Sequence, residues 1–164
     1  MSNDKSKSFF DEHESGRGPE LSEGLVAKAE QKLGVRLPRA YLDLLTARNG
    51  GTPRRRCFMT ERPTSWARNQ FQIQTLIGLG YEDGIDGEFG SQYMIQEWGY
   101  PTIGVVVFDT PAGGPDTVML DYSACGAAGE PRVVYVDEDR SVRVVADDFC
   151  EFVSRLVECS ELGA

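Results

Sequence analysis

The sequence predicts an α+β domain: an N-terminal helical hairpin and a C-terminal helix packed on an antiparallel or mixed sheet of four to six strands. Two observations support this prediction. Apolar residues recur at helical spacing over 21–45 and 149–157, whereas residues 102–145 contain short β-branched runs separated by glycine and proline turns. The chain has 164 residues, 40% of them hydrophobic, which is enough for one domain with a substantial core.

The domain is expected over residues 21–160, after a disordered or loosely attached polar tail over residues 1–20. The tail mixes both charges and ends near Gly18 and Pro19. Its apolar pair, Phe9-Phe10, is a candidate to dock onto the domain.

The predicted helical hairpin has recognisable start and stop signals. Ser22 is expected to cap a helix over 23–33, and Gly34 can end it in the left-handed conformation. Pro38 suits the first turn of a second helix, because that turn needs no backbone N–H there. Asn49-Gly50 ends this helix, since both residues tolerate positive φ.

The strands follow a long connection that begins at Pro53 and a glycine-rich loop over 78–90. Alternation or β-branched composition identifies them. The predicted strands span residues 71–74, 102–108, 117–121, 132–137 and 142–145, with a short helix over 92–98.

The last helix is predicted to start at Asp147, whose side chain can cap it. Its apolar stripe runs from Phe149 to Val157 at intervals of three and four residues. Glu151 and Arg155 are spaced to pair across one turn.

Charge is unevenly distributed along the chain. The formal net charge is −9, and residues 109–164 hold 12 acids against 4 arginines. Such a surface repels phosphate backbones, so nucleic-acid binding is not expected, and it attracts a basic protein partner. Plain solubility is an equally good explanation of the same charge.

The sequence predicts a cytoplasmic protein with reduced thiols. No apolar run approaches the ~20 residues that a membrane span needs, and no apolar segment of a secretion signal begins the chain. No pair of cysteines forms a CxxC motif, so zinc and redox chemistry are not expected. The four cysteines are Cys57, Cys125, Cys150 and Cys159.

Nucleophilic catalysis has little support, because the one histidine, His13, lies in the polar tail. Acids near Asp83 do not follow the spacing of a calcium loop. Asp109, Asp116 and Asp121 lie beside glycine turns and could act as acid and base, as carboxylates do in glycosidases. The alternative is that they cap turns and strand ends. No metal or cofactor is expected.

An ordered set of short motifs extends across most of the chain. The first half carries Glu30, Leu33-Gly34, Leu37-Pro38, Tyr41 and Asn49-Gly50-Gly51. The second half carries Gly113-Gly114 with Asp116, Leu120-Asp121-Tyr122, Gly129-Glu130-Pro131, Val133 to Asp137, and Phe149 with Phe152. This set resembles the SUKH superfamily. One departure is Pro115, where bacterial relatives often carry histidine.

The resemblance implies an α+β fold with no catalytic residues and no cofactor. Bacterial members are similar to immunity proteins of polymorphic toxin systems, and fungal members resemble regulators of cell-wall synthesis. The leading hypothesis is therefore a cytoplasmic immunity protein that binds a cognate toxin, such as a basic nuclease domain. The alternatives are a regulatory scaffold of a housekeeping enzyme and a carboxylate-based hydrolase.

An acidic surface with an aromatic anchor is the expected contact region, because charge complementarity steers association and aromatic side chains anchor interfaces. The candidate partner-binding residues are Asp109, Asp116, Asp121, Asp137, Glu138 and Asp139, with Trp66 or Trp98 as the anchor.

Overall fold

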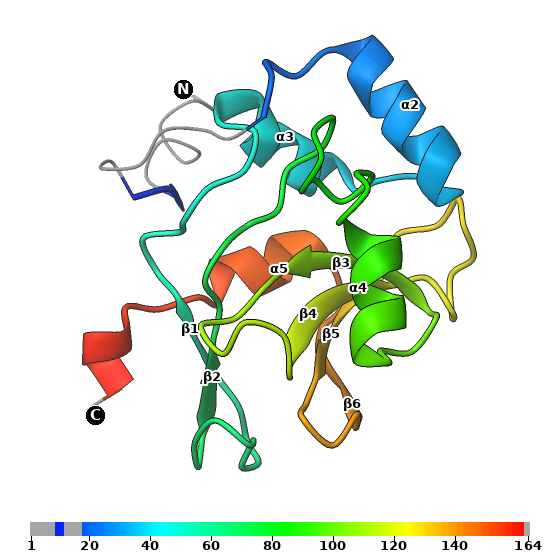
Figure 1. Cartoon of the computed structure of the whole chain (residues 1–164). Helices are drawn as coiled ribbons and strands as arrows, with labels where there is room; N and C mark the ends of the chain where they lie inside the picture. Colours follow the sequence, from blue (N-terminus) through cyan, green and yellow to red (C-terminus); the bar gives the residue numbers. More distant parts are fainter. Residues whose placement is uncertain (1–8, 12–17, 163–164) are drawn as a thin grey trace.

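An antiparallel four-stranded sheet, ordered β3-β4-β5-β6, forms the centre of the fold (Figure 1). The computed structural model describes residues 9–11 and 18–162. The architecture is α+β, as the sequence predicts. The strands are β3 (Gly104–Phe108), β4 (Thr117–Asp121), β5 (Arg132–Val136) and β6 (Val142–Ala146).

The three strands β3, β4 and β5 are buried along almost their whole length. Their β-branched composition suits a strand covered on both faces. Strand β6 differs, because it lies at the end of the sheet and alternates between exposed and partly buried residues. The edge at β6 is therefore the open side of this sheet.

A second sheet pairs β1 (Cys57–Met59) with β2 (Gln70–Gln72). The sequence predicts β2 one or two residues late and misses β1, which it assigns to a connection. A strand of three residues is too short to show a period of two. Tertiary packing supplies the missing signal, because Phe58 and Phe71 lie opposite each other and are both buried.

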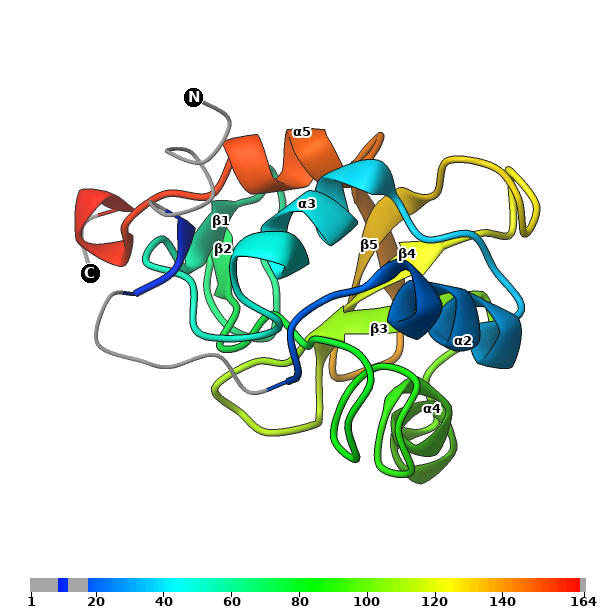
Figure 2. The same cartoon turned by 90° about the horizontal axis from the view of Figure 1, so that it is seen from above.

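The N-terminal helices are α2 (Glu23–Leu33) and α3 (Arg39–Ala47). Their predicted start and stop signals are confirmed at both ends of α2. The Leu25 N–H donates to Ser22 Oγ at 3.1 Å, and Gly34 adopts a φ of 71°. The predicted short helix is α4 (Ser91–Trp98). From above, the strands of the main sheet lie between α4 and α5 (Phe149–Ser154) (Figure 2).

Helix α5 starts one residue later than predicted and ends earlier. Asp148, rather than Asp147, caps it, because the Asp148 carboxylate accepts the Glu151 N–H at 2.8 Å. Beyond the helix, Val157 forms a β-bridge with Cys57 instead of extending the apolar stripe. The predicted Glu151–Arg155 pair forms, with an N–O distance of 3.4 Å.

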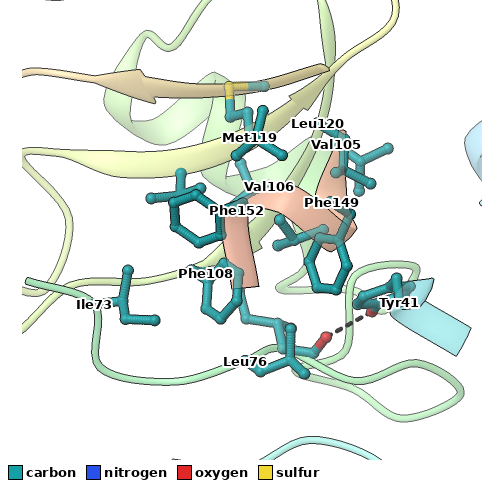
Figure 3. Close-up of a cluster of buried hydrophobic side chains, with 14 of the residues drawn as sticks. Tyr41, Ile73, Leu76, Val105, Val106, Phe108, Met119, Leu120, Phe149 and Phe152 are labelled. Carbon is teal, nitrogen blue, oxygen red and sulfur yellow. Dashed lines mark hydrogen bonds between the residues drawn. The ribbon is translucent and has the colours of Figure 1, made fainter. Parts of the chain in front are cut away.

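A stack of aromatic rings joins the two sheets to α5. Phe71 stacks on Tyr135 of β5 with ring centroids 4.1 Å apart, and Phe58 stacks on Phe152 at 4.8 Å. The same core includes Phe149, which packs edge-on against Tyr41 of α3 (Figure 3). Rings from β1, β2, β5 and α5 thus fix the position of the small sheet against the large one.

The predicted docking of the Phe9-Phe10 pair is confirmed. Phe10 is buried in the core, with the Arg48 guanidinium over its ring, and Phe9 packs against the same core. The other tail residues, His13 among them, lie mostly outside the described residues. Near the C-terminus, Cys159 begins a 3-10 helix (Cys159–Leu162) and forms a disulfide with Cys57, whereas the sequence predicts reduced thiols.

Candidate functional site

The predicted acidic contacts mostly point inward. Asp116 is 2% exposed and accepts hydrogen bonds from the hydroxyls of Thr110 and Tyr135. Burial and the hydrogen bond to the Asp116 carboxylate raise the pKa of Tyr135 above its ordinary value. Asp116 therefore serves as the acceptor of a buried network.

Asp121 is buried at the far end of β4. It accepts the Ser123 N–H at 2.8 Å and the Arg132 Nε–H at 2.8 Å. Burial alone would raise the pKa of Asp121, but the hydrogen bonds from Ser123 and Arg132 lower it overall. The carboxylate is thus held ionised in a strand-end turn.

Asp137 is buried and ties three segments together. Its carboxylate accepts N–H groups from Ser65 at 3.1 Å and Glu138 at 2.8 Å. It also pairs with Arg143 of β6 at 3.3 Å. Through these contacts, Asp137 anchors the loop between β1 and β2 to the end of β5.

Of the six predicted acids, only Glu138 and Asp139 are classed as exposed, while Asp109 is partly buried and accepts the Thr75 N–H at 2.7 Å. Hydrogen bonds from Ser141 lower the pKa of Asp139. The turn-capping interpretation therefore describes most of this set, and the exposed acids form a short hairpin tip.

Asp116 and Asp121 cannot share one cleft as acid and base. Asp116 directly precedes β4 and Asp121 ends it. Five residue steps along an extended strand place their Cα atoms about 17 Å apart. Glycosidase carboxylates are about 5–9.5 Å apart, so this pair does not fit that chemistry.

The two predicted aromatic anchors are both partly exposed. Trp66 lies in the loop between β1 and β2, and Trp98 ends α4. The Trp98 ring packs so closely on Gly114 that a side chain at 114 would overlap it. Arg140 donates to the carbonyls of Trp98 and Pro115, at 2.8 and 2.6 Å. Trp98 is therefore held in place by the turn it covers.

A groove of about 730 Å³ runs between β1 and β6, and we call it the β1–β6 groove. The sequence does not reveal it, because β1 is not predicted and the two strands are far apart in the chain. The alternation of valine and arginine at Val142-Arg143-Val144 is the sequence signal that could have indicated a strand with one solvent-facing side. The lining residues are Phe58, Met59, Thr60, Glu61, Arg62, Ser141, Val142, Arg143, Val144, Val145 and Arg155.

Arginine side chains hold the walls of this groove in place. Arg143 pairs with Asp137 and donates weakly to the Arg62 carbonyl at 3.4 Å, which ties the β1–β2 loop to β6. Arg155 donates to the Val145 carbonyl at 2.8 Å, and its guanidinium lies 4.7 Å above the Phe58 ring. These contacts hold the two walls of the β1–β6 groove in fixed positions.

Valines, Met59 and arginines form most of the lining of the β1–β6 groove. Its described lining includes one carboxylate, Glu61, and neither histidine nor cysteine. Throughout the described residues, no group of three or more His, Cys, Asp or Glu side chains is placed to hold a metal ion. No helix in the described ranges has the length and apolar character to cross a bilayer.

The N-terminal motif residues tie the helical hairpin together and connect it to the glycine-rich loop. The Glu30 carboxylate accepts the Leu37 N–H at 2.7 Å, and the Tyr41 hydroxyl donates to the Ile77 carbonyl at 2.6 Å. The Asn49 side chain accepts the Leu79 N–H at 2.9 Å and donates to the Leu79 carbonyl at 2.8 Å. Sequence reasoning assigns Asn49 to a helix end and misses this role as a clamp on the glycine-rich loop.

Comparison with known families matches residues 23–153 to a SUKH model described as SMI1-KNR4 cell-wall. A search of curated proteins found no significant match. The family match covers most of the chain and the same motifs that carry the resemblance in sequence. The chain therefore belongs to the SUKH superfamily.

Proposed function

We propose that this chain is a non-catalytic protein-binding domain, and specifically an immunity protein that neutralises a cognate bacterial toxin by direct binding. The SUKH superfamily includes toxin immunity proteins and cell-wall regulators, so binding is the activity they share. One observation supports a binding role in this chain. Three of its six candidate acids, Asp116, Asp121 and Asp137, are buried in structural hydrogen bonds, while exposed apolar side chains and arginines line one groove.

Neutralisation would work by occlusion. A domain whose sheets are joined by stacked aromatic rings presents a rigid surface, and binding to a rigid surface costs little conformational entropy. The net charge of −9 would steer a basic toxin domain toward the chain and raise the association rate.

The alternative within the family is a regulatory scaffold for a housekeeping enzyme. It uses the same fold and surface and differs only in its partner. A carboxylate-based hydrolase is less compatible with the geometry, because its best candidate pair lies at opposite ends of β4.

The proposed location is the cytoplasm, where an immunity protein would meet a toxin that has entered the cell. Disulfides are rare in that compartment, so the Cys57–Cys159 bond makes the location testable. A cytoplasmic location predicts that alkylating free thiols in intact cells before lysis, followed by mass spectrometry, finds both cysteines alkylated, although the structure has them bonded. Finding the pair oxidised in the cell would contradict a cytoplasmic location.

An immunity protein predicts a toxin gene beside the gene of this chain, and the function is tested by co-expressing the chain with the toxin domain found there. We expect growth to be restored and the two purified proteins to bind in calorimetry. A double variant at the exposed tip, Glu138→Lys with Asp139→Lys, should slow the association of the chain with the toxin at low salt without unfolding the domain. Continued toxicity, or no measurable binding, would contradict the immunity proposal.

A further inference from the structure

We propose that the β1–β6 groove binds an extended segment of the partner, carrying acidic side chains, as an added β-strand. The inference deepens the proposed function by assigning a surface and a partner chemistry to it. It depends on that function only for the identity of the protein that supplies the segment.

The β1 side of the groove is a strand edge. Cys57 uses both its backbone groups to pair with Val157, at 3.1 and 2.9 Å, on the side of β1 away from β2. In an antiparallel strand, residues two apart direct their N–H and C=O groups to the same side. The backbone groups of Met59 therefore face the same edge as those of Cys57, and Met59 lines the groove.

The β6 side is also a strand edge. The Asp137 N–H donates to the Ser141 carbonyl at 3.0 Å, so Ser141 is turned toward β5. The alternation of backbone direction then turns Val142 and Val144 outward. Strand β6 ends the sheet order, and an extended peptide adds to such an edge through main-chain hydrogen bonds.

Side chains along both edges give the added strand apolar contacts. Met59 is 51% exposed, Val142 is 43% exposed and Val144 is 50% exposed. These three side chains and the two strand edges form a surface that suits an added strand in which apolar and polar residues alternate, because its apolar face can pack against them.

Charge selects an acidic segment. The lining has three arginines, Arg62, Arg143 and Arg155, against Glu61, although the whole chain has a net charge of −9. Arg143 is already paired with buried Asp137. Arg155 is exposed but pairs with Glu151 at 3.4 Å, so exposed Arg62 is the group that would first meet a carboxylate of the segment.

The same charges argue against a second copy of this chain in the groove. A two-fold contact between β6 edges would place the arginines of one copy near those of the other. Like charges brought together in this way disfavour the contact. A separate acidic segment has no such penalty.

Synthetic peptides test the inference without any toxin. The probes are an eight-residue capped peptide of alternating Glu and Val, its Lys-Val counterpart, and the Glu-Val peptide N-methylated at alternate residues. Binding is measured by fluorescence anisotropy and mapped by amide chemical shifts. We expect only the unmodified Glu-Val peptide to bind, with the largest shifts at Met59, Val142 and Val144.

Matched variants connect the binding to the groove. Arg62→Glu and Val144→Glu should each lower the affinity for the Glu-Val peptide by about tenfold or more. The controls should stay within about twofold: Arg39→Glu makes the same charge reversal on α3, and Tyr93→Glu places a carboxylate at another exposed hydrophobic position, on α4. Circular dichroism confirms that each variant is folded.

Several results would overturn the inference. They are equal binding of the Glu-Val and Lys-Val peptides, no binding of the Glu-Val peptide, full binding of the N-methylated peptide, shifts outside the groove, or dimerisation through β6 in light scattering. Its failure is distinct from failure of the proposed function. If toxin rescue and toxin affinity are unchanged in Arg62→Glu and Val144→Glu, the groove assignment fails alone; if rescue fails but the peptide docks, the immunity proposal fails alone.

Discussion

The central strands and the β1–β6 groove use charged residues in opposite ways. In and beside β4 and β5, carboxylates are buried and each accepts several hydrogen bonds, as Asp116 and Asp137 do. Along the groove, arginines lie at the surface beside exposed valines. The comparison shows that a run of acids in a sequence can maintain a fold. The proposed binding surface instead carries exposed valines and arginines.

Removing a ring from the aromatic stack should produce the largest difference between the two regions. Phe152 is fully buried, so Phe152→Ala should cost about 3–5 kcal/mol of unfolding free energy. Val144→Ala on the open edge should cost less than about 0.5 kcal/mol. Urea unfolding measures both. Similar losses at the two positions would show that the groove edge belongs to the core.

Breaking the Cys57–Cys159 bond should have the next largest effect. The bond closes a loop with a sequence separation of 102, and opening a loop of this size costs about 2–5 kcal/mol. Cys159→Ser should therefore lower the melting temperature measured without reductant. The free cysteines Cys125 and Cys150 supply the control, because changing them to serine should leave the temperature unchanged. An unchanged melting temperature in Cys159→Ser would mean that the C-terminal segment contributes little to the fold.

Variants of Asp116 and Glu138 compare the contribution of a buried carboxylate to stability with that of an exposed one. Asp116→Ala leaves the buried Thr110 and Tyr135 hydroxyls without their acceptor, at a cost of about 2–3 kcal/mol. Glu138→Ala at the exposed tip should change stability by less than about 0.5 kcal/mol. Chemical denaturation measures both losses of stability. An Asp116→Ala variant as stable as the wild type would contradict the structural role that we assign to that carboxylate.

Replacing Asp121 should change stability the least, and the change should appear in how the stability depends on pH. Its pKa is lowered in the folded state, so it stabilises the fold above the unfolded-state pKa of about 4. This stabilisation is lost as the pH falls through the lower folded-state pKa. Wild-type stability should therefore decline more steeply below pH 5 than that of Asp121→Asn. Parallel declines in thermal melts would show that Arg132 and Ser123 do not hold the carboxylate ionised.

Local signals in the sequence predict much of the fold. Ser22 and Gly34 bound α2 because capping depends on neighbouring residues alone. The β-branched run around Val106 predicts a buried strand for the same reason. Asp147 and Asp148 show the limit, since both can cap and only the folded geometry selects Asp148.

The candidate site could not be predicted in the same way, because it depends on contacts between distant segments. Strand β1 gains its identity from Phe58 stacking on Phe71 and Phe152. The pairing of Cys57 with Cys159 likewise cannot be deduced from spacing. Asp137 illustrates both points: its position in a hairpin turn was predicted, but its contact with Ser65, 72 residues away, was not.

The central claim is that the partner contacts the β1–β6 groove while the buried carboxylates only maintain the fold. Amide hydrogen exchange of the chain, alone and in complex with the purified toxin domain that the proposal predicts beside its gene, tests this most directly. Complex formation should slow exchange at Val142, Val144 and Met59. Unchanged exchange along β6, with new protection confined to other surfaces, would contradict the claim.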